Sequence, residues 1–216
     1  MEFRLTYDGL LLGANSKTPR AKHKQEIREH FHPQLKQFWG KHPFLKSLKE
    51  NEHLSNKESY LLGYEQGTTG VKPLPGPTWL ERHSENFKRA DVRFAPLISD
   101  EMEMMCSLDI LFLRPGPPGA LVNGGDLDNR LKTLFDALRM PVSRDELAGF
   151  SMRDGFDPFF VLLEDDRLIT KISVETDLLL SPSSDNDNEC RLVIKVNAHP
   201  YAPSHESQRL NRAFWS

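Results

Sequence analysis

The sequence is poor in the features that mark secreted or membrane-bound proteins. It has only two cysteines, Cys106 and Cys190, and both lie in apolar stretches that predict strands, so no disulfide framework is expected. No apolar run approaches the ~20 residues that a membrane-spanning helix requires, and residues 1–4 do not begin a signal peptide. We therefore expect a globular protein in a reducing compartment, with no membrane as partner.

The chain also lacks a net positive charge, because 28 Lys and Arg stand against 31 Asp and Glu. Such a balance argues against a protein that coats nucleic acid through charge alone. The charges are unevenly distributed, however. Residues 17–49 contain nine basic residues and two acidic ones, which gives this segment a charge of +7.

Within this basic segment, Ile27, Phe31, Leu35 and Phe38 keep a helical spacing despite Pro33, which predicts an interrupted amphipathic helix. A basic helix face can follow the phosphates of a nucleic acid. The alternative is that the aromatic residues belong to the core and the lysines to an ordinary solvated face. The candidate nucleic-acid contacts are Lys17, Arg20, Lys22, Lys24 and Arg28.

Carboxylates are concentrated where a second helix is predicted to begin. Residues 129–139 contain no Gly or Pro, and their apolar residues recur at the spacing of one helix face: Leu131, Leu134, Phe135 and Leu138. Asp128, Lys132 and Asp136 follow one another at intervals of four residues, so they form a polar stripe beside the apolar one. Asp126 lies just ahead of this stripe.

These charges have two interpretations. Asp126 or Asp128 is well placed to cap the helix N-terminus, and Lys132 taken singly is an ordinary ion-pair partner of Asp128 or Asp136. Capping needs only one acid, however. Two carboxylates two residues apart repel each other, and such a pair favours the binding of a cation.

A further acidic pair follows a predicted strand. Residues 158–163 are an apolar run of strand length, Asp165 and Asp166 come directly after it, and residues 167–174 predict another strand. Aspartates are common in such turns, so the pair taken alone is explained by turn chemistry. Together with Asp126 and Asp128 it offers the oxygen ligands of a magnesium site.

Residues 126–138, followed by Asp165 and Asp166, resemble the RusA family of Holliday junction resolvases. The family pattern is Asp-x-Asp-Asn, a lysine four residues after the second Asp, then Phe-Asp-Ala-Leu, and later an Asp-Asp pair just ahead of a β-strand. The resemblance implies that Asp126, Asp128 and Asp166 are catalytic carboxylates that bind metal, with Asp165 as their neighbour in the metal site. It also implies that Lys132 is the essential catalytic lysine.

The same resemblance implies a fold and an activity. The fold would be α+β, with a mixed β-sheet packed with helices. The activity would be that of a Mg²⁺-dependent endodeoxyribonuclease, with Mn²⁺ as a substitute, which resolves Holliday junctions by paired symmetric nicks. Its partner would be branched DNA, above all the four-way junction, and it would act as a homodimer. Its location would be cytoplasmic, associated with the nucleoid of a prokaryote or encoded by a phage or mobile element.

We expect one domain over residues 1–216, with an N-terminal strand and basic helical extension in 1–100, a catalytic core in 101–200 and a tail in 201–216. The resemblance covers about residues 106–197. The connection from Asp128 to Asp166 is longer than the family usually has, and residues 140–157 have the character of an insertion. Two alternatives therefore stay open: a related nuclease acting on other branched DNA or on RNA, and a non-catalytic nucleic-acid-binding module of the same fold.

Overall fold

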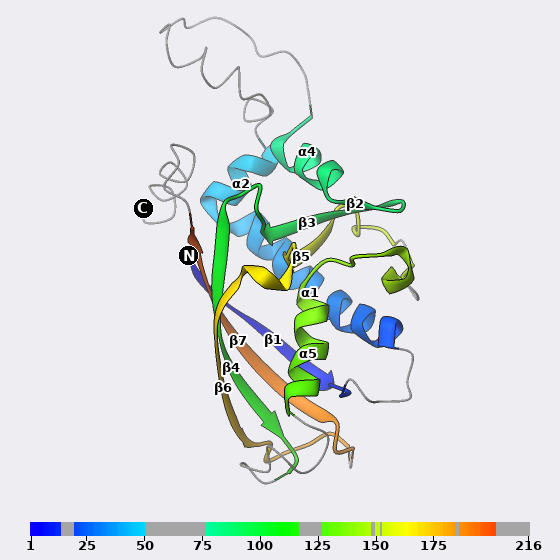
Figure 1. The fold of residues 1–216 in the computed structure, drawn as a ribbon, viewed down its shortest axis with the longest axis vertical. Coiled ribbons are helices and arrows are strands. Elements are labelled where there is room, and N and C mark those ends of the chain that lie inside the picture. The colour runs from blue at the N-terminus through cyan, green and yellow to red at the C-terminus, as the bar shows by residue number, and fades with distance from the viewer. Residues whose placement is uncertain are drawn as a thin grey trace, which may run out of the picture.

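The computed structural model describes residues 1–13, 20–50, 77–116, 127–147, 150–151, 153–184 and 186–201 (Figure 1). Its larger sheet has four strands in the order β1 (Glu2–Leu10), β7 (Glu189–Pro200), β4 (Met104–Arg114) and β6 (Ile169–Leu178). The β1–β7 and β7–β4 pairs are antiparallel, whereas β4 and β6 are parallel. The sheet is therefore mixed, and β1 and β6 are its two edges.

The alternation of apolar residues along the central strands explains why this sheet has one covered face. In β4 every second residue from Met104 to Phe112 is buried, and in β7 the same holds from Cys190 to Ala198. Side chains of a strand point alternately to the two faces of its sheet, so these residues form one apolar face. The helix α1 (Arg20–Lys41) adds a buried stripe to the same core, made of Ile27, Phe31, Leu35 and Trp39.

A smaller sheet contains β2 (Lys88–Arg89), β3 (Val92–Ile98) and β5 (Phe159–Leu163), in that order. β3 and β5 are parallel, and all five residues of β5 are buried. A β-bridge between Arg139 and Leu163 joins β5 to the segment that follows α5 (Leu127–Leu138). This bridge fixes the C-terminal end of α5 beside the end of β5.

The remaining helices are α2 (Pro43–Glu50), α4 (Trp79–Asn86) and the short 3₁₀ helices η2 (Arg144–Leu147) and η3 (Asp166–Leu168). α4 begins with a capping box, in which the Thr78 hydroxyl accepts from the N–H of Glu81 and the Glu81 carboxylate accepts from the N–H of Thr78. α1 corrects one expectation, because it runs without interruption through Pro33. Pro33 lies on the exposed side, where water can satisfy the carbonyl that its missing N–H leaves unbonded.

The predicted α+β class, with a mixed sheet packed with helices, is confirmed. The predicted N-terminal strand, the predicted strands around Cys106 and Cys190 and at 158–163 and 167–174, and the helix at 129–139 all occur, with ends shifted by a few residues. Cys106 and Cys190 are buried free cysteines in strands, as expected. In the segment proposed as an insertion, Met140, Phe150 and Phe156 pack against Phe94 and Phe159 in a second apolar cluster. Across the described ranges, no helix is long and apolar enough to cross a membrane.

Candidate active site on α5 and η3

The helix α5 presents Asp128 and Lys132 to solvent. Both side chains are exposed, and neither forms a hydrogen bond or an ion pair with another residue that the structure describes. α5 begins at Leu127, so Asp128 lies inside the first turn and does not cap the helix. Asp126, the other candidate for the cap, lies outside the described residues. The ordinary ion-pair explanation of Lys132 therefore finds no support within the described part of the chain.

Asp136, one turn further along the same stripe, is different because cations neutralise it. Its carboxylate accepts from Lys24 Nζ at 2.7 Å and from Arg139 Nη2 at 3.1 Å, and its side chain is 17% exposed. Burial raises the pKa of Asp136, but the hydrogen bonds and charges of Lys24 and Arg139 outweigh this effect, so the pKa lies below its usual value. The carboxylate of Asp136 therefore stabilises the fold through these two ion pairs.

Arg28 on α1 holds the C-terminal end of α5. Its side chain is 0% exposed, and its guanidinium donates from Nη2 to the carbonyl of Asp136 at 2.7 Å and from Nε to that of Arg139 at 3.1 Å. Glu146 of η2 lies 3.5 Å from Nη2 and also accepts from Arg139. Burial, reinforced by the charge of Arg139, lowers the pKa of Arg28 to about 10. The last carbonyls of a helix have no partner within the helix, and Arg28 supplies one.

The second acidic pair lies at η3, which is in contact with α5. Asp165 caps η3, because its carboxylate accepts from the N–H of Arg167 at 2.9 Å, so the turn interpretation applies to this residue. Asp166 is exposed and makes no side-chain hydrogen bond or ion pair with the described residues. Arg167 is paired with Asp100 of the β3–β4 connection.

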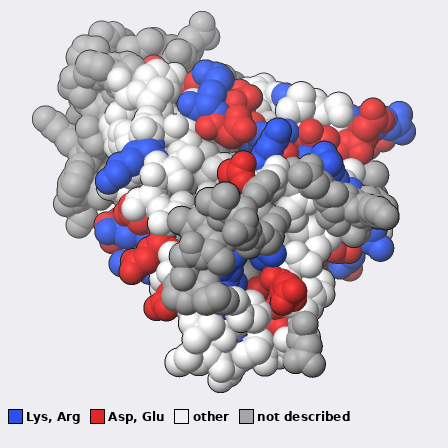
Figure 2. All heavy atoms as spheres, turned by 60° about the horizontal axis from the view of Figure 1, so that its bottom comes forward, with Lys and Arg blue, Asp and Glu red and all other residues white. Residues whose placement is uncertain are grey.

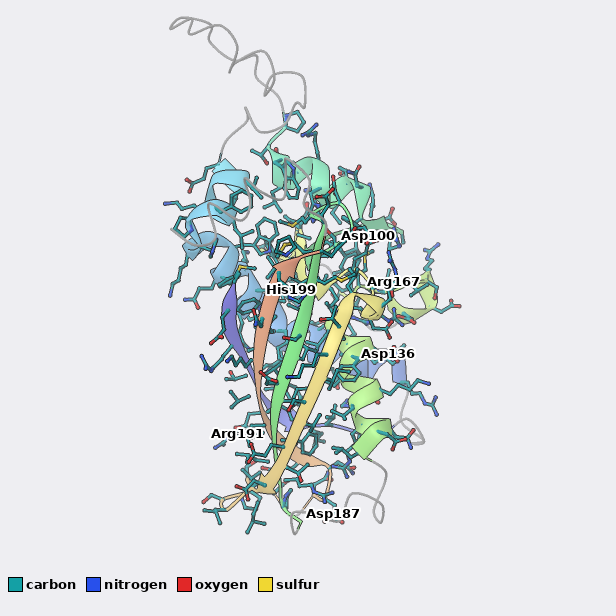
Figure 3. The ribbon with its side chains drawn as sticks, turned by 60° about the vertical axis from the view of Figure 1, so that its left-hand side comes forward. Asp100, Asp136, Arg167, Asp187, Arg191 and His199 are labelled. Atoms are coloured by element: carbon teal, nitrogen blue, oxygen red, sulfur yellow. The ribbon has the colours of Figure 1, made fainter. Side chains whose placement is uncertain are left out.

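Figure 3 shows how these elements lie along α5. Asp136 and Arg167 are near the same end of the helix, and Asp187 is beyond the other end, where Arg130 donates to its carbonyl at 3.2 Å. Asp128 belongs to the end beside Asp187, and Lys132 is one turn closer to η3. The fold thus brings η3 beside the Asp136 end of α5, whereas Asp128 lies about two turns away, toward the other end of the helix. Among the described residues, no three His, Cys, Asp or Glu side chains form a group that could hold a metal ion.

The donor chemistry nevertheless fits a hard cation. Asp128 and Asp166 offer carboxylate oxygens that are open to solvent and not consumed by ion pairs within the described residues. Oxygen-only ligands suit Mg²⁺ or Mn²⁺ better than zinc. The third proposed ligand, Asp126, lies outside the described residues.

The predicted nucleic-acid contacts on α1 need correction. Arg28 is buried and bound to α5, so it cannot reach a phosphate, and Lys24 is 15% exposed and paired with Asp136. Arg20 and Lys22 are exposed and stay predictions, whereas Lys17 lies outside the described residues. Phe31 and Trp39 of the same segment are core residues, as the alternative interpretation held.

Figure 2 shows basic and acidic side chains interspersed on the face that contains the lower end of the molecule in Figure 1. No broad basic surface is seen among the residues drawn in colour there. Contact with a polyanion on this face therefore depends on individual cations, or on an ion bound by the carboxylates.

The sequence did not reveal the network of Lys24, Arg28, Asp136, Arg139 and Glu146. One signal was present: Arg28 directly follows Ile27 in the buried stripe of α1, so it stands at the border of the apolar face. That position allowed either a solvated or a buried guanidinium. The contact with α5, over a hundred residues along the chain, decided between them.

Comparisons of this chain with models of protein families, with curated proteins and with solved structures found no match in any of the three.

Proposed function

We propose that this chain is a RusA-like, Mg²⁺-dependent endonuclease that cuts branched DNA, with the four-way junction as its first substrate and a homodimer as its working form. One observation carries the proposal. Within one polar stripe, Asp136 is neutralised by neighbouring cations, whereas Asp128 and Lys132 are exposed and unpaired among the described residues, as is Asp166 on the adjoining η3. The charges of Asp128, Lys132 and Asp166 are therefore available to a metal ion or a phosphate, whereas that of Asp136 is already neutralised within the fold.

In this proposal Asp126, Asp128 and Asp166 hold the metal, and Asp165 positions Asp166 by capping η3. The bound ion supplies Lewis-acid activation of water and neutralises charge at the scissile phosphate. Lys132 places its ammonium beside the phosphate and stabilises the additional negative charge of the transition state, an effect worth about 10²–10³ in rate. Arg28 and its partners hold the helix that presents Asp128 and Lys132.

The resemblance of residues 126–138 and 165–166 to the RusA pattern supports both the reaction and its substrate. A cytoplasmic setting, in a prokaryote or from a phage or mobile element, belongs to the same proposal. The alternative of a non-catalytic module that binds through a basic α1 loses support, because Lys24 and Arg28 are engaged within the protein.

The proposal is tested by offering purified protein labelled four-way junctions, flaps, forks, linear duplexes, single strands and RNA, with Mg²⁺, Mn²⁺ or EDTA. We expect paired nicks in the junction that EDTA abolishes and that Asp128→Asn and Lys132→Met reduce at least about 10²-fold. Asp91→Asn, an exposed acid on the β2–β3 connection, is the matched control and should cut normally. Metal-dependent cutting of another substrate would contradict the proposed substrate and support the proposed reaction. Binding of DNA without any cutting would refute the proposal that the protein is an enzyme.

A further inference from the structure

The two edge strands of the larger sheet, β1 and β6, differ in the contacts of their outward backbone groups. At β1, the side-chain amide of Gln34 on α1 accepts from the N–H of Thr6 at 2.9 Å and donates to its carbonyl at 2.7 Å, so α1 blocks this edge at the middle of the strand. At β6, no described strand or helix pairs with the outward backbone groups, and among the described side chains only Asp177 takes one up, by accepting from the N–H of Leu178 at the end of the strand. An open edge strand of 10 residues is a template for pairing with another strand.

Some side chains of β6 are also exposed on the face where the helices lie, although Val174 on that face is half-buried against the core. Leu108 and Ile110 of β4 are buried, yet Ile172, which pairs with Leu108, is 46% exposed. Leu178 is 40% exposed, and Leu180, just beyond the strand, is 85% exposed. The core therefore covers β4 fully and β6 only in part, which leaves Ile172, Leu178 and Leu180 exposed along this edge. Natural proteins usually cover or shorten such an edge.

The sequence of β6 is complementary to itself. If two copies pair antiparallel about a two-fold axis at Ser173, Lys171 of each copy lies opposite the partner's Glu175 on the outer face. On the helix-side face, Ile172 lies opposite the partner's Val174, and Thr170 opposite the partner's Thr176. Two ion pairs and two apolar pairs thus form in one register, and no like charges meet at these positions.

We propose that β6 is the interface of a homodimer, in which antiparallel β6–β6 pairing joins two four-stranded sheets into one. The occupant of the edge is a second copy of this chain, because the charges of the strand match its own reversed order. Ile169 lies four residues from the axis, so the two η3 turns that precede it would lie at least about 26 Å apart along the strand direction. This pairing would give the proposed nuclease two symmetric active sites. Only that role of the dimer rests on the proposed function.

The test is sedimentation of the full chain over a concentration series, without DNA or metal. We expect a dimer for the wild type. Lys171→Glu and Glu175→Lys each place like charges opposite one another twice, so each should weaken dimerisation about tenfold or more. The double variant Lys171→Glu with Glu175→Lys restores both ion pairs with their signs exchanged and should recover the dimer.

Asp91→Lys makes the same charge change as Glu175→Lys at an exposed position away from β6, and should sediment as the wild type does. Circular dichroism checks that each variant is folded, as expected for exposed positions. A monomeric wild type, single variants that dimerise normally, or a double variant that stays monomeric would each overturn the interface. Because no activity is measured, the loss of this proposal would leave the proposed chemistry standing, and the reverse also holds.

Discussion

His32 links three parts of the fold through a ring that must stay neutral. Its Nδ1 accepts from the N–H of Phe160 in β5 at 2.9 Å, which leaves the proton on Nε2, and Nε2 donates to the carbonyl of Gly155 at 3.2 Å. The ring stacks on Phe159 with centroids 4.5 Å apart and is 3% exposed. A second proton would have to enter at Nδ1, where a donor already points.

Burial lowers the pKa of His32 from 6.5 to about 4, helped by the charge of Lys36 and opposed by the backbone hydrogen bonds. In the unfolded chain the ring takes up a proton below about pH 6.5, whereas the folded chain resists it until about pH 4. The stabilisation of the fold by the neutral His32 ring is therefore fully present above pH 6.5 and is lost as the pH falls from 6.5 to about 4. The difference in pKa corresponds to about 3 kcal/mol of unfolding free energy.

The assay is urea unfolding of the wild type and of His32→Gln between pH 7 and pH 4. Gln keeps a donor and an acceptor without titrating, so the variant should start less stable at pH 7, through lost ring packing, and then lose about 3 kcal/mol less on acidification. The carboxylates and the other histidines titrate in both proteins and cancel in the comparison. His199→Gln, an exposed substitution on β7, serves as the control. Parallel pH curves for wild type and His32→Gln would refute the reasoning.

Three further results are expected. Arg28→Met should lower the unfolding free energy by about 3–5 kcal/mol in urea titrations, because two helix-end carbonyls and Glu146 lose a buried partner. The control, Arg20→Met at an exposed position of α1, should change the unfolding free energy by less than about 0.5 kcal/mol. Mg²⁺ at about 100 times its dissociation constant should raise the melting temperature by about 5–10 °C in scanning calorimetry, and Asp128→Asn should reduce that rise. Glu101→Gln should destabilise the fold by about 1–3 kcal/mol, since Glu101 accepts from the buried His83 at 2.7 Å.

Sequence periodicity predicted the elements whose pattern is local. Every second residue of β4 is apolar, and α5 has apolar residues at helical spacing, so both were identified with small errors at their ends. The continuity of α1 through Pro33 was not predicted, because it depends on which side of the helix meets solvent. The pairing of β3 with β5 was also not predicted, since it joins segments more than sixty residues apart.

For the candidate site too, the sequence indicated some candidate residues and gave no basis for predicting the role of others. Motif and spacing identified Asp128, Lys132 and Asp166 as candidates, and the structure leaves all three exposed and without side-chain partners among the described residues. The fate of Arg28 could not be predicted, because its burial depends on carbonyls at the end of a helix that is distant in sequence. Charge alone does not reveal whether a cation is solvated or buried with partners.

Substitution of Asp128 and of Asp136, which lie at opposite ends of the polar stripe of α5, should separate an effect on cleavage from an effect on stability. The Asp136 carboxylate pairs with Lys24 and Arg139, so Asp136→Asn would remove the ion pair of Lys24 and leave Glu146 to balance both Arg28 and Arg139. We expect that substitution to lower the unfolding free energy by about 3 kcal/mol and to reduce cleavage only as far as the folded fraction falls. Asp128→Asn removes an exposed, unpaired charge, so it should leave stability within about 0.5 kcal/mol and abolish metal-dependent cleavage. Loss of cleavage in fully folded Asp136→Asn would move the metal site toward η3, and would contradict the division of roles along α5.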